Sequence, residues 1–147
     1  MSGDRPAIGL VVAGIAGVLI SAYLTVTHYA GGTLACVSAA FVDCDAVTSS
    51  SYSLVPYTEI PVALAGLVWS AASAAGGALA LRADPPWLRP AHLAWAAAGV
   101  LVALYLINAE IAVIGRICEW CTALHLIVFA TLFLALRRVR MGDTSAA

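Results

Sequence analysis

The chain has 147 residues, of which 63% are hydrophobic and 10% are charged, and its mean hydropathy is +0.97. A water-soluble domain of this size needs more polar surface, so the composition places the chain in a lipid bilayer. The net charge of -1, without a basic groove or an aromatic platform, gives no support for a nucleic-acid partner.

Four apolar stretches are each long enough to cross roughly 30 Å of hydrocarbon as an α-helix. They cover residues 7–29, 60–81, 91–115 and 117–136. Helices are expected because a segment in the bilayer core must satisfy its backbone hydrogen bonds internally. We therefore predict an all-α integral membrane protein, a four-transmembrane-helix bundle that forms a single domain over residues 1–147. A cleaved secretion signal over residues 1–35 is the alternative for the first stretch, but its apolar run exceeds the roughly 7–15 residues of such signals.

Small residues in the first two stretches offer a way for helices to pack closely. Gly14 and Gly17 lie in the first stretch, and Ala72 and Gly76 lie in the second. They permit close backbone approach between helices, although ordinary small-residue lining explains them equally well.

Arginine placement predicts the orientation, because short loops rich in cationic residues stay in the cytoplasm. Six of the seven cationic residues precede the first stretch, flank the connection between the second and third, or follow the fourth: Arg5, Arg82, Arg89, Arg137, Arg138 and Arg140. We expect both termini in the cytoplasm, with residues 30–59 and the turn around Arg116 on the extracytoplasmic side.

All four cysteines fall on that extracytoplasmic side, where disulfides persist. Cys36 and Cys44 lie in the long loop of residues 30–59, and Cys118 and Cys121 open the fourth stretch. Residues 37–47 are too apolar for a solvated linker, so we expect a short half-helix here, over the mouth of the bundle.

Cys118 and Cys121 form a Cys-x-x-Cys motif at a predicted helix N-terminus, where the helix dipole and unpaired N–H groups stabilise a thiolate. A structural disulfide between such close residues would constrain little chain, so redox function is favoured. The rival is a zinc site of four cysteines. Seven residues separate Cys36 from Cys44, which is wider than the usual zinc-ligand spacing, so no metal is expected.

Two exchangeable pairs on one membrane surface can form a relay, because a thiolate attacks a disulfide through a mixed intermediate. The loop pair can reach a protein, and the pair at the helix mouth can reach a lipid-soluble acceptor. Since no flavin or haem motif is present, a membrane quinone is the expected electron sink. The resting disulfides stay open: either two separate pairs or Cys44 with Cys118.

The combined pattern resembles the vitamin K epoxide reductase family, specifically its bacterial thiol-oxidising members. The resemblance rests on the two cysteine pairs, on Ser50 six residues after Cys44, and on Ile60-Pro61 at the second stretch. It implies a multi-pass protein of the bacterial inner (cytoplasmic) membrane that reoxidises a periplasmic thioredoxin-fold (DsbA-like) disulfide donor and passes the electrons to menaquinone or ubiquinone. Bacterial members often carry a fused thioredoxin domain after the last span. Only residues 137–147 follow here, so the partner is expected to act in trans.

The resemblance also implies individual roles. The partner exchanges at Cys36, Cys44 then attacks Cys118, and the freed Cys121 reduces the quinone. Ser50 is expected to support the loop and the site.

Polar residues near Cys121 are further candidates for the quinone site. His125, one helical turn deeper, is expected to face the pocket and bind a quinone carbonyl, or else to bond a neighbouring helix. Glu110 and Asn108 are costly in a bilayer and therefore functional candidates. Glu110 could pair with His125, deliver protons, or be solvated at the interface.

Several aromatic residues accompany these groups. Tyr105 could face the same cavity or only pack, and Trp120, inside the motif, could gate the sulfurs. Trp69 and Trp95 are interpreted as packing or interface aromatics.

Two other functions remain open. One is reduction of vitamin K epoxide or a quinone by thiols. The other is a non-catalytic membrane protein whose cysteines form structural disulfides or bind metal. A structural role does not require a Cys-x-x-Cys at a helix mouth with His125 below it.

Overall fold

The computed structural model describes residues 4–37 and 39–146 and is all-helical apart from loops and isolated bridges. Its long helices are α1 (Asp4–Ala30), α3 (Val62–Arg82), α4 (Leu88–Asn108) and α5 (Glu119–Ala146). Two short helices, α2 (Cys44–Thr48) and η1 (Ser51–Ser53), lie between α1 and α3, and a π-helical turn, η2 (Ala109–Ile114), continues α4. Four helices among the described residues are long and apolar enough to cross a membrane, which confirms the predicted bundle.

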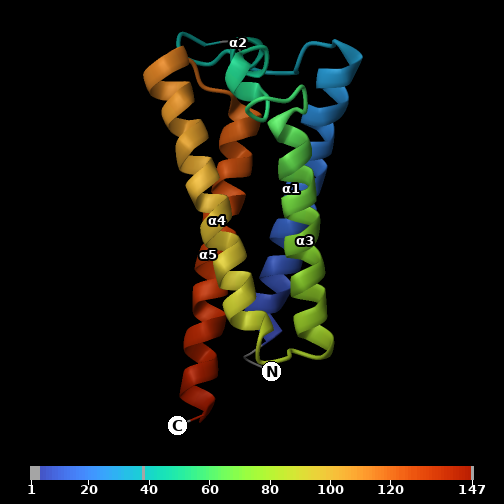
Figure 1. The fold of residues 1–147 in the computed structure, drawn as a ribbon, viewed down its shortest axis with the longest axis vertical. Helices are drawn as coiled ribbons and strands as arrows, with labels where there is room; N and C mark the ends of the chain where they lie inside the picture. Colours follow the sequence, from blue (N-terminus) through green and yellow to red (C-terminus); the bar gives the residue numbers. More distant parts are fainter. Residues whose placement is uncertain (1–3, 38, 147) are drawn as a thin grey trace.

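The two ends of the bundle differ in character (Figure 1). Both chain termini lie at one end, and α2 with the loop around it covers the other. The predicted half-helix over the bundle mouth is therefore confirmed as α2. The Asp43 side chain caps α2 by accepting the N–H of Ala46 at 2.9 Å.

The predicted limits of the third and fourth spans need two corrections. Helix α5 begins at Glu119 and continues to Ala146, beyond the predicted end at residue 136. Hydropathy marks where the apolar run stops, and the arginines after it are strong helix formers that extend the helix out of the membrane. The third span ends in the π turn η2, which Gly115 terminates in the left-handed conformation with φ 68°.

Helices α1 and α3 pack closely because glycines of α1 lie against α3. A Cβ on Gly14 would lie 2.6 Å from the backbone nitrogen of Ala74, and one on Gly17 would lie 2.5 Å from the Ser70 hydroxyl. The role expected for Gly14 and Gly17 is confirmed. Ala72, in contrast, is exposed and does not belong to this contact, because the facing side of α3 carries Ser70 and Ala74.

The other contacts complete the bundle. Helix α1 also packs against α5, and α5 packs against α4, so α5 joins the two sides. At the end remote from the cysteines, Asp84 forms ion pairs with Arg89 and with the buried Arg138. These pairs tie the α3–α4 connection to α5.

Candidate active site

The four cysteines form one disulfide and one dithiol. Cys36 and Cys44 are bonded to each other, whereas Cys118 and Cys121 are free thiols. Of the two patterns left open by the sequence, the structure has the separate pairs, with the outer pair oxidised and the inner pair reduced.

Backbone hydrogen bonds bring the two pairs together. The N–H of Asp43 donates to the carbonyl of Ile117 at 3.1 Å, and the N–H of Ile117 donates to the carbonyl of Phe41 at 2.9 Å. Asp43 and Ile117 immediately precede Cys44 and Cys118. The pairing therefore fixes the positions of these two cysteines relative to each other.

Cys44 and Cys118 belong to one buried cluster with Val47, where their exposed fractions are 2% and 0%. Cys36 and Cys121 pack against the same cluster. Sulfur atoms separated by more than seventy positions in the chain thus share one apolar environment.

Trp120 holds the loop segment that carries Cys36. Its indole N–H donates to the Ala35 carbonyl at 2.8 Å, and the Tyr23 hydroxyl accepts the Ala35 N–H at 3.0 Å. The rings of Tyr23 and Trp120 meet edge to face, with centroids 4.9 Å apart. Trp120 therefore packs against the cysteine cluster and, through Tyr23, contacts α1.

Cys118 occupies the capping position of α5. Its sulfur accepts the backbone N–H of Cys121 at 3.3 Å, and its carbonyl accepts the N–H of Thr122 at 2.9 Å. The side-chain hydrogen bond from Cys121 lowers the pKa of the Cys118 thiol, even though burial acts in the opposite direction. This lowered pKa favours the thiolate form of Cys118.

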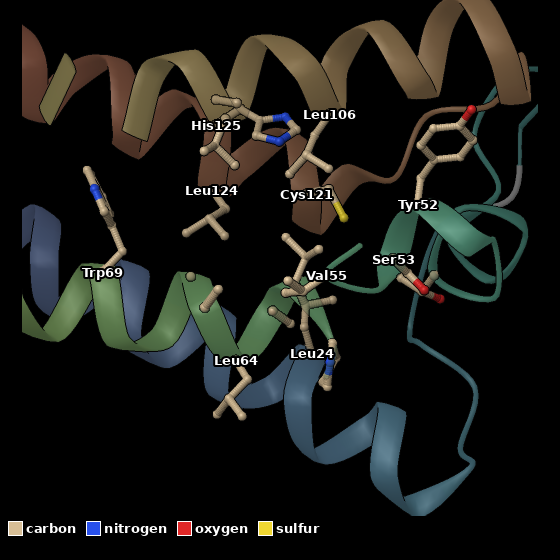
Figure 2. A pocket seen from close by; sticks show the side chains of 18 of the residues that line it. Leu24, Tyr52, Ser53, Val55, Leu64, Trp69, Leu106, Cys121, Leu124 and His125 are labelled. Carbon is tan, nitrogen blue, oxygen red and sulfur yellow. The ribbon is translucent and has the colours of Figure 1, made fainter. Parts of the chain in front are cut away.

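A cavity of about 630 Å³ opens beneath the inner pair, between α3, α4 and α5. Of the four cysteines, Cys121 is the one that lines it, and Figure 2 shows its sulfur and the His125 ring facing this space from α5. Most of the lining is aliphatic, including Leu64 and Leu106. Such a lining suits a flat, apolar ligand with few polar groups.

Two tryptophans line the end of the cavity remote from the cysteines. The Trp69 indole N–H donates to the Trp95 carbonyl at 3.2 Å, and the Trp95 indole N–H donates to the Trp69 carbonyl at 3.3 Å. Interpretation of the sequence treated this pair only as packing or interface residues. No sequence signal links them, because their pairing depends on how α3 and α4 cross.

Three of the predicted quinone-site residues line the cavity: Ser50, Glu110 and His125. The Ser50 hydroxyl donates to the Val47 carbonyl at 2.7 Å and so closes the end of α2. Glu110 is only 5% exposed, so the alternative of a solvated interfacial carboxylate is wrong. Among the residues that the structure describes, no ion pair joins Glu110 to His125.

The remaining three predicted residues lie elsewhere. Tyr105 is 51% exposed and its ring centroid lies 6.3 Å from that of Tyr52, which does line the cavity. Asn108 is exposed, and Trp120 packs on the cysteine cluster. Tyr52 itself was missed by the sequence interpretation, because its position depends on the fold of η1.

Among the described residues, one group of side chains brings potential metal-ligand atoms close together. The ligand atoms of Cys36, Cys44 and Glu119 lie within 4.8 Å of one another. In the present redox state the two sulfurs are bonded to each other, so they cannot offer the thiolates that zinc requires.

A membrane bundle with a loop disulfide packed on a helix-capping dithiol, itself at the mouth of an apolar cavity, defines a membrane thiol oxidoreductase. The chain belongs to the vitamin K epoxide reductase family, whose family model matches residues 8–136. Membership in this family implies the use of a quinone. None of the curated proteins matches the chain.

Proposed function

We propose that this protein oxidises the thiols of an extracytoplasmic thioredoxin-fold protein and passes the electrons to a membrane quinone, thereby supporting disulfide formation. The observation that carries the proposal is that the cysteines occupy different places in the site. Cys44 and Cys118 share one buried cluster, while Cys121 faces the apolar cavity. Electrons entering at the loop therefore have a continuous route to a lipid-soluble acceptor.

The first stage is exchange at the outer disulfide. A thiolate of the partner attacks Cys36, and Cys44 leaves as a thiolate. The second thiolate of the partner then attacks its own bridging sulfur, which releases an oxidised partner and leaves Cys36 and Cys44 as a dithiol. Cys36 is the accessible entry point, because Cys44 is buried.

The second stage transfers the electrons inward. Cys44 attacks Cys118 of an inner disulfide, and Cys121 leaves as a thiolate. Cys36 then attacks Cys44, which restores the outer disulfide and frees Cys118. The product has an oxidised outer pair and a reduced inner pair, the same redox state that the structure has.

In the final stage the inner dithiol forms a disulfide, and a quinone takes up two electrons and two protons to become a quinol. The cavity fits such an acceptor because it is largely aliphatic, with Cys121 and His125 offering polar atoms at one end. His125 is positioned to bind a quinone oxygen.

The arginine pattern supports an inner-membrane orientation with both termini in the cytoplasm and the cysteines outside. Asp84 and its two arginine partners lie at the end remote from the cysteines. The thioredoxin-fold protein would then act in trans from the periplasm.

The test uses detergent-purified protein, a reduced thioredoxin-fold protein and spectroscopic detection of quinol. Cys121→Ala should abolish quinol formation with any reductant. Cys36→Ala should block the protein reductant but leave turnover with a small dithiol. Quinol formation by Cys121→Ala at the wild-type rate would show that another group delivers the electrons. Replacing the quinone with vitamin K epoxide in the same assay tests the alternative substrate.

A further inference from the structure

Glu110 is a buried acidic side chain beside the inner pair, and the stages above do not use it. It is the one acidic residue among those lining the cavity. The π turn η2 carries it, and both Gly115 and Arg116 donate backbone N–H groups to the Glu110 carbonyl. Such single π turns are frequent at functional sites because they redirect one side chain.

The Glu110 carboxyl faces the inner cysteines. It is close enough to interact electrostatically with the backbone of Cys118 and with the thiols of Cys118 and Cys121. Among the described residues the ion pairs involve Asp84 and not Glu110, and the Arg116 side chain donates to the Ala40 carbonyl at 3.1 Å. A buried carboxyl that lacks a cationic partner is more stable with its proton than without it.

Quinol formation needs two protons, and the inner pair supplies only one of them when Cys118 is a thiolate. In that form Cys121 retains the single thiol proton. A second donor must therefore lie close to both the sulfurs and the cavity. Glu110 meets both conditions.

We propose that Glu110 donates the second proton in quinol formation, an inference that rests on the proposed function. The Cys118 thiolate, the Cys121 thiol, the protonated Glu110 and a quinone yield the Cys118–Cys121 disulfide, the Glu110 carboxylate and a quinol. The thiol pair loses two electrons and the quinone gains them. One proton comes from Cys121 and one from Glu110, and the total charge is unchanged.

The relay also returns the proton. When the outer dithiol reduces the inner disulfide, Cys36 and Cys44 release two protons. Cys121 takes one, and the Glu110 carboxylate takes the other. Cys118 remains a thiolate. Glu110 thus moves one proton per cycle from the outer pair to the quinone and couples proton transfer to electron transfer.

Other titratable groups surround the same space and must be controlled in any pH experiment. Those lining the cavity with Glu110 are His28 from α1, Tyr52 from η1, and Cys121 and His125 from α5. Cys118 faces Glu110 from the start of α5, and Cys44 of α2 is held in the outer disulfide. His125 is the principal competitor as a proton donor.

The experiment is a single turnover in which fully reduced protein is mixed with excess quinone. Glu110→Gln keeps the size and the acceptor oxygen of the side chain but has no proton to give. Quinol formation should slow by roughly 100-fold, a typical loss on removing a general acid, and the fall in rate at high pH that deprotonation of Glu110 causes in the wild type should be lost. Glu110→Asp should restore part of the rate.

The controls separate proton donation from a structural role. Exposed Glu59, outside the cavity lining, provides the matched variant Glu59→Gln, which should behave as wild type. Reduction of the Cys36–Cys44 disulfide by a small dithiol and quinone quenching of tryptophan fluorescence should both be unchanged in Glu110→Gln, which shows a folded protein with an intact cavity.

Two results would overturn the inference. One is a wild-type rate for Glu110→Gln. The other is a slowed rate whose pH profile parallels that of the wild type, because Glu110 would then only shape the site. Failure of the proposed function looks different: the wild-type protein itself would form no quinol.

Discussion

Gly99 on α4 lies directly against the indole ring of Trp69 on α3: a Cβ at Gly99 would lie 2.6 Å from the ring carbons. In most helices a Gly→Ala change stabilises by about 1 kcal/mol. Here the added methyl group must displace the indole and break its hydrogen bond to Trp95. We expect Gly99→Ala to lower the thermal unfolding temperature and to raise the KM for quinone several-fold. Thermal scans and quinone titrations measure both.

A matched control for this change is Gly32→Ala, whose Cβ would meet only the Thr27 methyl at 3.6 Å. It should leave the KM for quinone unchanged. Stabilisation by Gly99→Ala with an unaltered KM would mean that the cavity does not depend on the position of Trp69.

The shared cluster of Cys44 and Cys118 predicts a specific trapped intermediate. A variant with Cys36→Ser and Cys121→Ser retains only these two sulfurs, and mild oxidation should join them rapidly and almost completely. Mass spectrometry of the digested protein identifies the bond.

The complementary variant, Cys44→Ser with Cys118→Ser, retains Cys36 and Cys121. It should crosslink far more slowly, because neither sulfur is at the centre of the cluster. Equal crosslinking in the two variants would disprove the assigned order of exchange.

Trp120 should control how readily the loop segment that carries Cys36 moves away from α5. Trp120→Phe keeps an aromatic ring but removes the hydrogen bond to the Ala35 carbonyl, which contributes about 1 kcal/mol. Reduction of the outer disulfide by a small dithiol should accelerate about fivefold. Trp87→Phe, at an exposed position outside the cluster, should change nothing. A slower reduction in Trp120→Phe would contradict this holding role.

The lowered pKa of Cys118 predicts a shift in its titration. The thiol of Cys121 donates the hydrogen bond that lowers this pKa, so Cys121→Ala should move the pKa of Cys118 upward. Thiolate absorbance in the ultraviolet, followed with pH, should then rise at higher pH in Cys121→Ala than in the reduced wild type. To isolate Cys118, both proteins carry Cys36→Ser and Cys44→Ser. An unchanged midpoint would show that the Cys121 thiol does not lower the pKa of Cys118.

The class of fold could be predicted from the sequence because its determinants are local. The length of an apolar run sets whether a helix can cross the bilayer, and a Cys-x-x-Cys after a short turn falls at a helix start wherever the helix packs. The half-helix between the cysteine loop and α3 followed from an apolar stretch too long to be solvated.

The composition of the cavity could not be predicted in the same way. The π turn places an extra residue in the last turn of α4, which changes the direction of each following side chain. Glu110, inside this turn, is buried at the cavity, whereas Tyr105 and Asn108, which precede the turn on the regular part of α4, are exposed. A regular helical period cannot anticipate such a change.

The sequence by itself determined the four long apolar helices and the short helix between the first two of them, and it predicted two cysteine pairs on one side of the membrane. Only the tertiary structure decided which sulfurs share a cluster, which one faces the cavity and where the Glu110 carboxyl lies. Helix formation and membrane insertion depend on properties of neighbouring residues, whereas these contacts depend on how distant helices are rotated and packed against one another.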